Sequence, residues 1–397
     1  MTNKENTVLN LENVKIVLGN GYDLFCGLKT KYKDYFSSNP SKNTYIKSWL
    51  NEFMKDLCIS PMSYVNFSLK ENKDFWLDCQ GFEELSVWDF FFYLVSDIQP
   101  DVQEEWCWCD IEKVMQRWLY EPSDQNEYIE NSSWYTVYRL LSGNYSKSCD
   151  GKIYVLASII YKKNNEQCIY SIDKFYNFLL IELKKFERKF GYYIDNLIHD
   201  RTNESFGIVR YRNNYSLISR ALIEKLCAID NISSIESFNY DFIEVDELKN
   251  KFHNINGSIN SPIFGVDSSL FFAPDPRYIF TKTNRRMELD MDTDDAYAQE
   301  EFNNIVFFGH SLTASDYSYF FSIFDKIDII DLTKKSKIVF AYAIYDEELE
   351  DKIKSDYRLA IFSLFQEYSI YKGNKDAPNR LLDALTTQGK IILYEIK

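Results

Sequence analysis

A glycine-containing segment near the start of the chain has the residue types of a phosphate-binding loop. The apolar run 14–18 is followed by the segment 19–23, GNGYD. Glycines let a backbone turn sharply through positive φ, and the first amides of a following helix attract anions. The dinucleotide fingerprint G-x-G-x-x-G is two-thirds present, because Leu24 holds the place of its third glycine. From these residues alone, a nucleotide site and an ordinary turn are equally good interpretations.

Polar residues also follow two later strand-like runs. Asn239 and Asp241 come directly after the run 232–238, and His310 comes after the run 305–308. Open α/β sheets bind ligands at the carboxyl ends of their strands, so these residues are candidates for a site. Histidine has a pKa suited to proton transfer near neutral pH. The alternative for Asn239 is an asparagine that simply forms a turn.

Two further clusters contain residues that could bind a ligand, and each could equally have a purely structural role. If the segment 108–112 is helical, Trp108 and Glu112 lie on one face and could reach one cleft. The alternative is a core tryptophan beside a solvated glutamate. The basic run 280–286 could contact phosphate or pair with surface carboxylates.

No metal site is predicted. The aspartates between residues 290 and 295 lack the glycine and glutamate positions of a calcium loop. The eight cysteines are scattered, and Cys107 and Cys109 do not have the spacing of a zinc site.

The elements expected to position these residues alternate along the C-terminal part of the chain. Alternation of strands and helices is typical of a parallel sheet that is covered on both faces. Strands are predicted at 14–18, 232–238, 305–308, 337–344 and 390–396, and helices after Thr30 as N-cap, from 315 or 316, near 347–365 and near 377–387.

Residues 40 to 230 differ from the rest of the chain, with few glycines and aromatic residues at helical spacing. We therefore predict an α/β fold: a Rossmann-like, mainly parallel sheet with helices on both faces, interrupted by a large, mostly helical insertion. The predicted domains are a core formed by 13–38 plus 231–397, and an insertion at 39–230 that covers the site.

Composition limits the classes of partner. The chain of 397 residues has a formal net charge of −15, which disfavours broad binding to nucleic acid or to anionic membranes. It has no apolar run of the roughly 18 residues that a membrane span needs. Its first residues, MTNKENTVLN, lack the pattern of a signal peptide. We therefore expect a cytoplasmic protein without a membrane partner.

Taken in order, the motifs resemble those of the phage abortive-infection AbiH family. The opening motif of that family looks like GNGFDL…GLPT.Y.DF, and this chain reads GNGYDLFCGLKTKYKDYF, with Lys29 at the usual proline position. The segments 108–112, 280–286 and 309–316 also look like family motifs. More remotely, the order is similar to that of sirtuin-type NAD-binding proteins. There a glycine loop holds the dinucleotide, an asparagine lies beside the nicotinamide ribose, and a His-Gly step and a Gly-x-Ser-Leu turn follow.

The resemblance implies a set of site residues. The implied ligand-binding residues are Gly19, Asn20, Gly21, Tyr22, Asp241, Asn256, Gly257, Gly309, Ser311 and Asp316. The candidate catalytic residues are Asn239, which would orient the ribose and a water, His310, and a carboxylate that would stabilise the ribose cation, namely Asp23, Glu112 or Asp241. The main departure is Asn256-Gly257, where the sirtuin pattern has His-Gly, because asparagine cannot accept a proton at neutral pH.

The function implied is antiphage defence, with hydrolysis of NAD or a related nucleotide at the nicotinamide–ribose bond. A non-catalytic nucleotide-binding sensor is the alternative that Asn256 favours. A nuclease toxin is a second alternative, although the acidity and the lack of a metal-ligand cluster fit it poorly. A phage-derived trigger and self-association into a homo-oligomer stay open as further partners besides the nucleotide.

Overall fold

The structure is a computed structural model that divides the chain into two compact units. Unit 1 comprises residues 1–30, 191–262 and 286–397, and unit 2 comprises residues 31–190 and 263–285. The residues described are 10–38, 46, 48–52, 82–95, 109–120, 132–143, 151–165, 167–199, 208–241, 245–289, 301–345 and 347–396.

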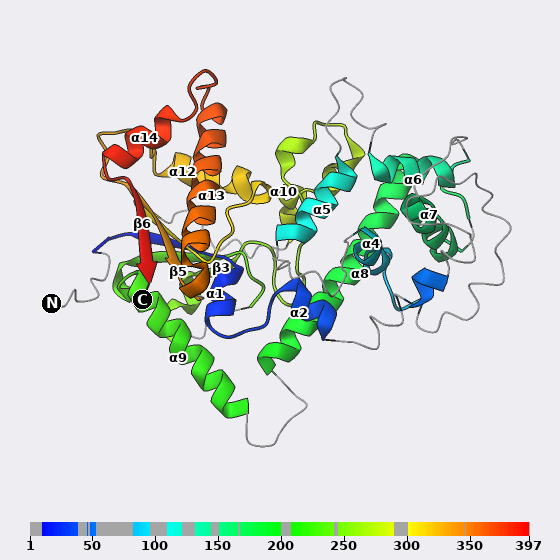
Figure 1. Cartoon of the computed structure of the whole chain (residues 1–397), viewed down its shortest axis with the longest axis horizontal. Helices are drawn as coiled ribbons and strands as arrows, with labels where there is room; N and C mark the ends of the chain where they lie inside the picture. The colour runs from blue at the N-terminus through cyan, green and yellow to red at the C-terminus, as the bar shows by residue number, and fades with distance from the viewer. Residues whose placement is uncertain are drawn as a thin grey trace. The chain divides into compact units, whose positions relative to one another are not determined.

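A six-stranded sheet forms the centre of unit 1, and every strand pair in it is parallel (Figure 1). The strands lie in the order β3-β2-β1-β4-β5-β6, which is the order of a Rossmann-like sheet. Their bounds are β1 Val14–Leu18, β2 Ile232–Ser237, β3 Phe252–Asn254, β4 Asn304–Phe308, β5 Lys337–Ala343 and β6 Ile391–Ile396. The predicted fold class is thus confirmed.

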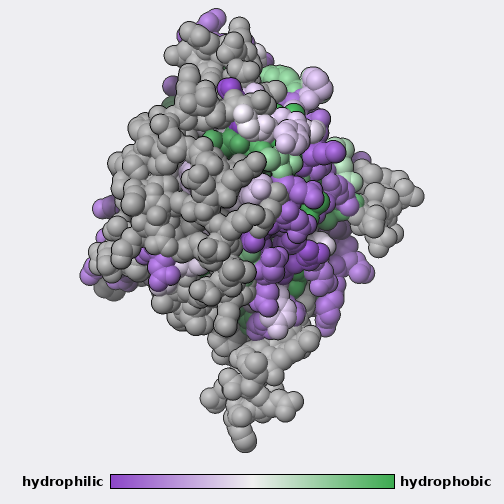
Figure 2. Space-filling model, turned by 90° about the vertical axis from the view of Figure 1, so that its right-hand side faces the viewer, coloured by the Kyte–Doolittle hydropathy of each residue, from purple (hydrophilic) through white to green (hydrophobic). Residues whose placement is uncertain are grey.

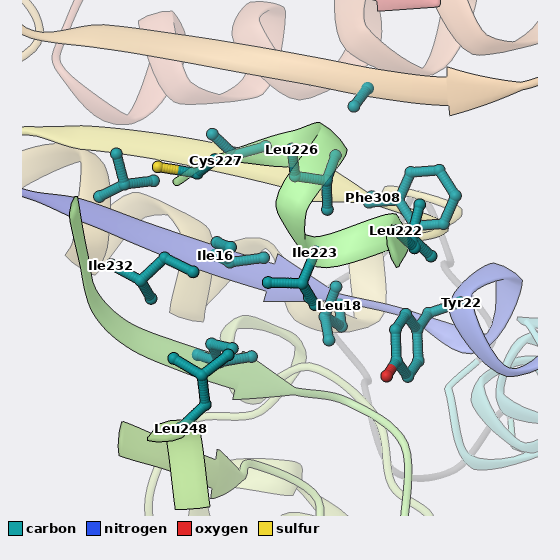
Figure 3. Packing of buried hydrophobic residues seen from close by; sticks show 14 of the residues in the cluster. Ile16, Leu18, Tyr22, Leu222, Ile223, Leu226, Cys227, Ile232, Leu248 and Phe308 are labelled. Atoms are coloured by element: carbon teal, nitrogen blue, oxygen red, sulfur yellow. The ribbon is translucent and has the colours of Figure 1, made fainter. Parts of the chain in front are cut away.

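Alternating side chains of the strands pack into two hydrophobic clusters, one on each face of the sheet. Ile16 and Leu18 belong to the cluster that includes Leu222 and Ile223 of α9, as Figure 3 shows. Val17 faces the opposite way and belongs to the cluster that includes residues of α12, α13 and α14. In Figure 1 these three helices lie on one side of the sheet and α9 lies on the other. Their bounds are α9 Ile208–Leu226, α12 Tyr317–Lys326, α13 Glu350–Tyr371 and α14 Arg380–Thr387.

Unit 2 is built largely from helices whose aromatic side chains pack together. Trp88 contacts Trp134 with ring centroids 5.4 Å apart, and Phe91 contacts Trp118 at 5.1 Å. The helices are α2 Tyr32–Ser37, α4 Val87–Val95, α5 Cys109–Leu119, α6 Ser133–Leu141 and α7 Gly151–Lys163. Two helices, α8 Ile172–His199 and α10 Lys282–Met287, contribute residues to both units. Short 3₁₀ helices lie at Ile229–Asn231, Asp246–Lys251, Ser268–Leu270, Pro276–Phe280, Ala314–Asp316 and Glu347–Leu349.

The units differ from the predicted domains at three places. Residues 31–38 were expected in the core but lie in unit 2. Residues 191–230 were expected in the insertion, but α9 packs on the sheet through Leu222, Ile223 and Leu226, so they lie in unit 1. Residues 263–285 were expected in the core but lie in unit 2. One contact that joins this segment to the rest of unit 2 is the ion pair between Arg285 and Glu187.

Two local expectations at the start of the chain are corrected. The helix α1, Asn20–Phe25, begins directly after Gly19, where a turn was expected. The residue before α2 is Lys31 rather than the expected N-cap Thr30, whose hydroxyl instead donates to Asn20 Oδ1 over 2.5 Å.

Among the described residues, none of the helices combines the length and the apolar character that crossing a membrane requires. On the face shown in Figure 2, the described residues are mainly hydrophilic, with smaller hydrophobic areas between them.

Candidate functional site

The segment that follows β1, residues 19–22 with the start of α1 (the β1 loop), packs backbone to backbone against the loop that follows β4. The Gly19 amide donates to the Phe308 carbonyl over 3.0 Å, and the Gly21 amide donates to the Gly309 carbonyl over 2.8 Å. A Cβ atom on Gly21 would lie 2.6 Å from the Gly309 Cα, and one on Gly19 would lie 2.5 Å from the His310 Cα. Side chains at these positions would therefore separate the two loops.

This packing corrects the expected role of the glycines. Gly19 has φ of −115°, and Gly21 lies within α1, so neither uses the left-handed region that the sequence suggested. Gly309 has φ of +69° and is the residue that needs that freedom. Gly19 and Gly21 are required because the loops approach closely.

The amides of this segment were expected to bind phosphate, but most of them already have acceptors within the protein. Gly19 and Gly21 donate to the β4 end as described, and the Tyr22 amide donates to the Gly19 carbonyl over 2.9 Å. In this arrangement, three of the four amides from Gly19 to Tyr22 are not available to a phosphate group. The loop serves mainly to join β1 to β4.

Two buried carboxyl groups meet beside this loop. Asp23 of α1 and Asp241, which follows β2, are 3% and 2% exposed, and their side chains are hydrogen-bonded to each other. Burial raises the pKa of Asp241 to about 6. Burial and the Asp241 charge raise the pKa of Asp23 well above its usual value. Two carboxylates in contact cannot both be ionised at low cost, so the pair shares a proton near neutral pH.

Asn239 links the acidic pair to the β1 loop. Its Nδ2 donates to the Gly19 carbonyl over 3.1 Å and to Asp23 Oδ1 over 2.9 Å. Both amide hydrogens are thereby used, which fixes the orientation of the side chain. Among the described residues, none donates a hydrogen bond to Asn239 Oδ1.

Three residues that the sequence did not single out hold this group. Tyr215 of α9 donates to Asp241 Oδ2 over 2.5 Å, and Ser219, one turn later, is hydrogen-bonded to the Tyr22 hydroxyl. Asn254 of β3 donates from Nδ2 to the carbonyl of Asn239 over 2.9 Å and to that of Asp241 over 2.7 Å. The only sequence signal is the i, i+4 spacing of Tyr215 and Ser219, which does not identify their partners.

A second polar cluster is centred on Arg286. Its Nη2 donates to Asn256 Oδ1 over 2.9 Å and lies 3.6 Å from Asp316 Oδ1, while its Nε donates to the Ile255 carbonyl over 3.1 Å. Asn256 Nδ2 donates to the Phe238 carbonyl over 3.4 Å. Asn256 is thus held at both ends of its amide.

His310 is held in the same way. Its Nδ1 accepts the Leu312 amide hydrogen over 2.9 Å, and its Nε2 lies 3.7 Å from Asp316 Oδ2. The ring lies edge-on between Phe238 and Phe320, with centroid distances of 4.6 and 5.0 Å. Because Nδ1 is an acceptor here, the ring hydrogen is on Nε2 and faces the carboxylate. This geometry favours a positioning role for His310 in its turn over the expected acid–base role.

The remaining candidates are Ser311, Gly257 and Glu112. Ser311 is exposed, and Gly257 is buried with φ of +81°. Glu112 belongs to unit 2, where its Oε2 accepts from Lys282 Nζ over 2.8 Å and both side chains are buried. Trp108 and residues 290–295 lie outside the described residues.

The basic run 280–286 pairs with buried carboxylates. Lys282 pairs with Glu112, and Arg285 forms a two-pronged ion pair with Glu187 at 2.9 and 2.7 Å. Glu112 and Glu187 are 5% and 2% exposed. The basic side chains Lys282 and Arg285 thus pair with carboxylates, as one of the two alternatives had it, but these carboxylates are buried and not on the surface.

Comparisons of the chain with protein-family models, with curated proteins and with solved structures found no match. Within the described part of the chain, no group of three or more histidine, cysteine, aspartate or glutamate side chains could hold a metal ion. The geometry of the site thus carries the functional argument.

Proposed function

We propose that the chain hydrolyses NAD, or a related nucleotide, at the nicotinamide–ribose bond. The observation that carries this proposal is the cluster of Asp23, Asn239 and Asp241 at the carboxyl ends of β1 and β2. In sheets with this strand order, dinucleotides bind outside the carboxyl ends where the order reverses, which here is between β1 and β4. The cluster lies beside the β1 loop at that point, because Asn239 donates to the Gly19 carbonyl.

The chemistry follows from the protonation of the pair. The ionised carboxylate stabilises positive charge that develops on the ribose as the bond from C1′ to the nicotinamide nitrogen breaks. The bonding electrons leave with neutral nicotinamide, a water oxygen bonds to C1′, and the carboxylate accepts the proton of that water. Asn239 Oδ1 accepts a hydrogen bond from a ribose hydroxyl and orients the sugar.

Substitution of Asn239 by alanine is expected to reduce the rate of NAD cleavage by about a hundredfold or more, because the ribose and Asp23 both lose their positioning. The measurement is steady-state release of nicotinamide by the purified full chain. The matched control is Asn303→Ala at an exposed asparagine, which should leave the rate unchanged. Equal rates for wild type and the Asn239 variant would rule out this site.

A non-catalytic nucleotide sensor is a second candidate, and a specific observation favours it. Asn256 is held by Arg286, and His310 Nδ1 is occupied by the Leu312 amide. The first of these positions is an asparagine, and at the second the acceptor nitrogen of the histidine is already used. Neither position therefore offers the ribose a base. Mass spectrometry of the ligand released from purified protein separates the two functions. A stoichiometric dinucleotide that is never converted supports the sensor.

We also propose that this activity serves antiphage defence, as the likeness of the opening motif to the AbiH family implies. Cells that express the wild-type chain are expected to give fewer phage plaques than cells that express Asp241→Asn, since the variant loses the ionisable group. Plaque counts measure the effect, and immunoblots check that both chains are present equally. Equal plaque counts across a panel of phages, at equal protein levels, would contradict the defence role.

A further inference from the structure

One face of α9 supplies hydroxyl groups to the acidic site. Tyr215 and Ser219 lie one helical turn apart, which places them on the same side of the helix. Tyr215 donates to Asp241 Oδ2 over 2.5 Å, and Ser219 is bonded to the Tyr22 hydroxyl. Tyr215, Tyr22 and the two aspartates are all buried. The contact between Tyr215 and Asp241 is therefore shielded from water.

The two carboxyl groups do not receive equal support. Asp241 Oδ2 accepts a hydrogen bond from the phenol hydroxyl of Tyr215, which is a more acidic donor than an amide. Asp23 accepts from Asn239 Nδ2. Hydrogen bonds that are donated to a carboxylate favour its charged form. The geometry therefore places the negative charge on Asp241 and the shared proton on Asp23.

We propose that Tyr215 is a positioning residue that keeps the shared proton on Asp23 and leaves Asp241 as the ionised carboxylate. For its catalytic meaning this inference rests on the proposed function, in which the ionised member stabilises the ribose cation. The donor arrangement itself is independent of that function. Tyr215 thereby sets the lower pH limit at which the site is active.

Among the described residues, the other titratable groups that interact with the pair stay neutral across the working range of pH. They are Tyr22 and Cys26, together with Tyr215 itself, and burial is the largest cause that raises the pKa of each. Titration near neutral pH at this site therefore belongs to the two aspartates.

The first test is the pH dependence of stability. Because the folded pKa of Asp241 lies above its unfolded value, its contribution to stability is present below about pH 4 and is lost as pH rises through the folded pKa. Tyr215→Phe removes a donor to the charged form, so the folded pKa should rise by about one unit and the loss should extend to correspondingly higher pH. Urea unfolding of the full chain between about pH 4.5 and 8 measures this shift. The range brackets the folded pKa of Asp241 in wild type and the higher one expected in the variant.

Two further variants make the test specific. Tyr192→Phe removes a hydroxyl from an exposed tyrosine and should leave the pH profile unchanged. In an Asp241→Asn background, Tyr215→Phe should no longer shift the profile, since the group that it acts on is gone. An unshifted profile in Tyr215→Phe, or a shift that persists when Asp241→Asn is also present, would overturn the inference.

The second readout is NAD cleavage as a function of pH, whose acidic limb should move upward by a similar amount in Tyr215→Phe. The two readouts separate the two proposals. If the stability profile shifts while wild type cleaves no NAD, the proposed hydrolysis fails and the inference about Tyr215 stands. If the stability profile does not shift, the inference fails whatever the activity.

Discussion

Replacement of Gly309 by alanine is expected to lower the free energy of unfolding by more than about 3 kcal/mol. The new Cβ would lie 2.4 Å from the Tyr22 nitrogen and 2.6 Å from the Gly21 carbonyl carbon. Both are backbone atoms that cannot move without breaking the contact between the β1 and β4 loops. The residue would also keep a φ of +69°, which is strained for alanine. Urea unfolding followed by circular dichroism measures the loss.

Gly389 provides a matched control for this variant. Its φ of +67° is almost the same, but a Cβ atom there would have no neighbour within 4 Å. Gly389→Ala should therefore show the backbone strain alone, about 1 kcal/mol. The difference between the two variants is the cost of forcing the loops apart, and equal losses would show that the close approach imposes none.

Substitution of Lys15 by methionine is expected to destabilise the chain by about 3–5 kcal/mol. Lys15 Nζ pairs with Glu236 Oε1, and the two side chains are 5% and 3% exposed. Methionine has a similar length and no charge, so the change leaves the Glu236 carboxylate buried without its cation. Tyr319 also donates to Glu236, but a neutral donor compensates a buried charge only in part. The measurement is again the free energy of unfolding in urea.

The double variant Lys15→Met/Glu236→Gln should recover much of this stability, because it removes the charge that Lys15 had compensated. Lys334→Met serves as an exposed control. Lys334 pairs with Asp328, but the side chains are 48% and 52% exposed, so the change should cost less than about 1 kcal/mol. A double variant as unstable as the single one would show that the loss of the Lys15 charge beside Glu236 is not the cause.

Five of the six strands could be predicted, because each contains apolar residues in a short run or at strand spacing. The strand β3, Phe252–Asn254, was not predicted, since three residues with partly exposed side chains give no such signal. Lys15 shows what an apolar pattern cannot predict, namely how a charged residue within a buried strand is compensated. It lies within β1, and its partner Glu236 lies 221 positions away, so the sequence alone cannot show that the charge is neutralised.

The residues of the candidate site divide in the same way. Asn239 and Asp241 follow a strand, and the rule that ligands bind at the carboxyl ends of strands identified them, whereas Asp23 was identified through the family resemblance. Tyr215 and Asn254 could not be found, because their roles depend on where α9 and β3 pack. Gly21 was identified for the wrong reason, since closeness to Gly309 depends on the neighbouring strand and not on the local chain.

The position of β1 in the middle of the sheet has a consequence for synthesis of the chain on the ribosome. Its neighbours, β2 and β4, begin at Ile232 and Asn304, after the whole first segment of unit 2. At about 5–20 residues per second, translation delivers β2 roughly 10–40 s after β1. During that time the largely apolar segment VKIVL cannot pair with β2 or β4, because neither has been synthesised. We therefore expect nascent chains that end before Ile232 to bind chaperones through this segment, and longer chains to release them.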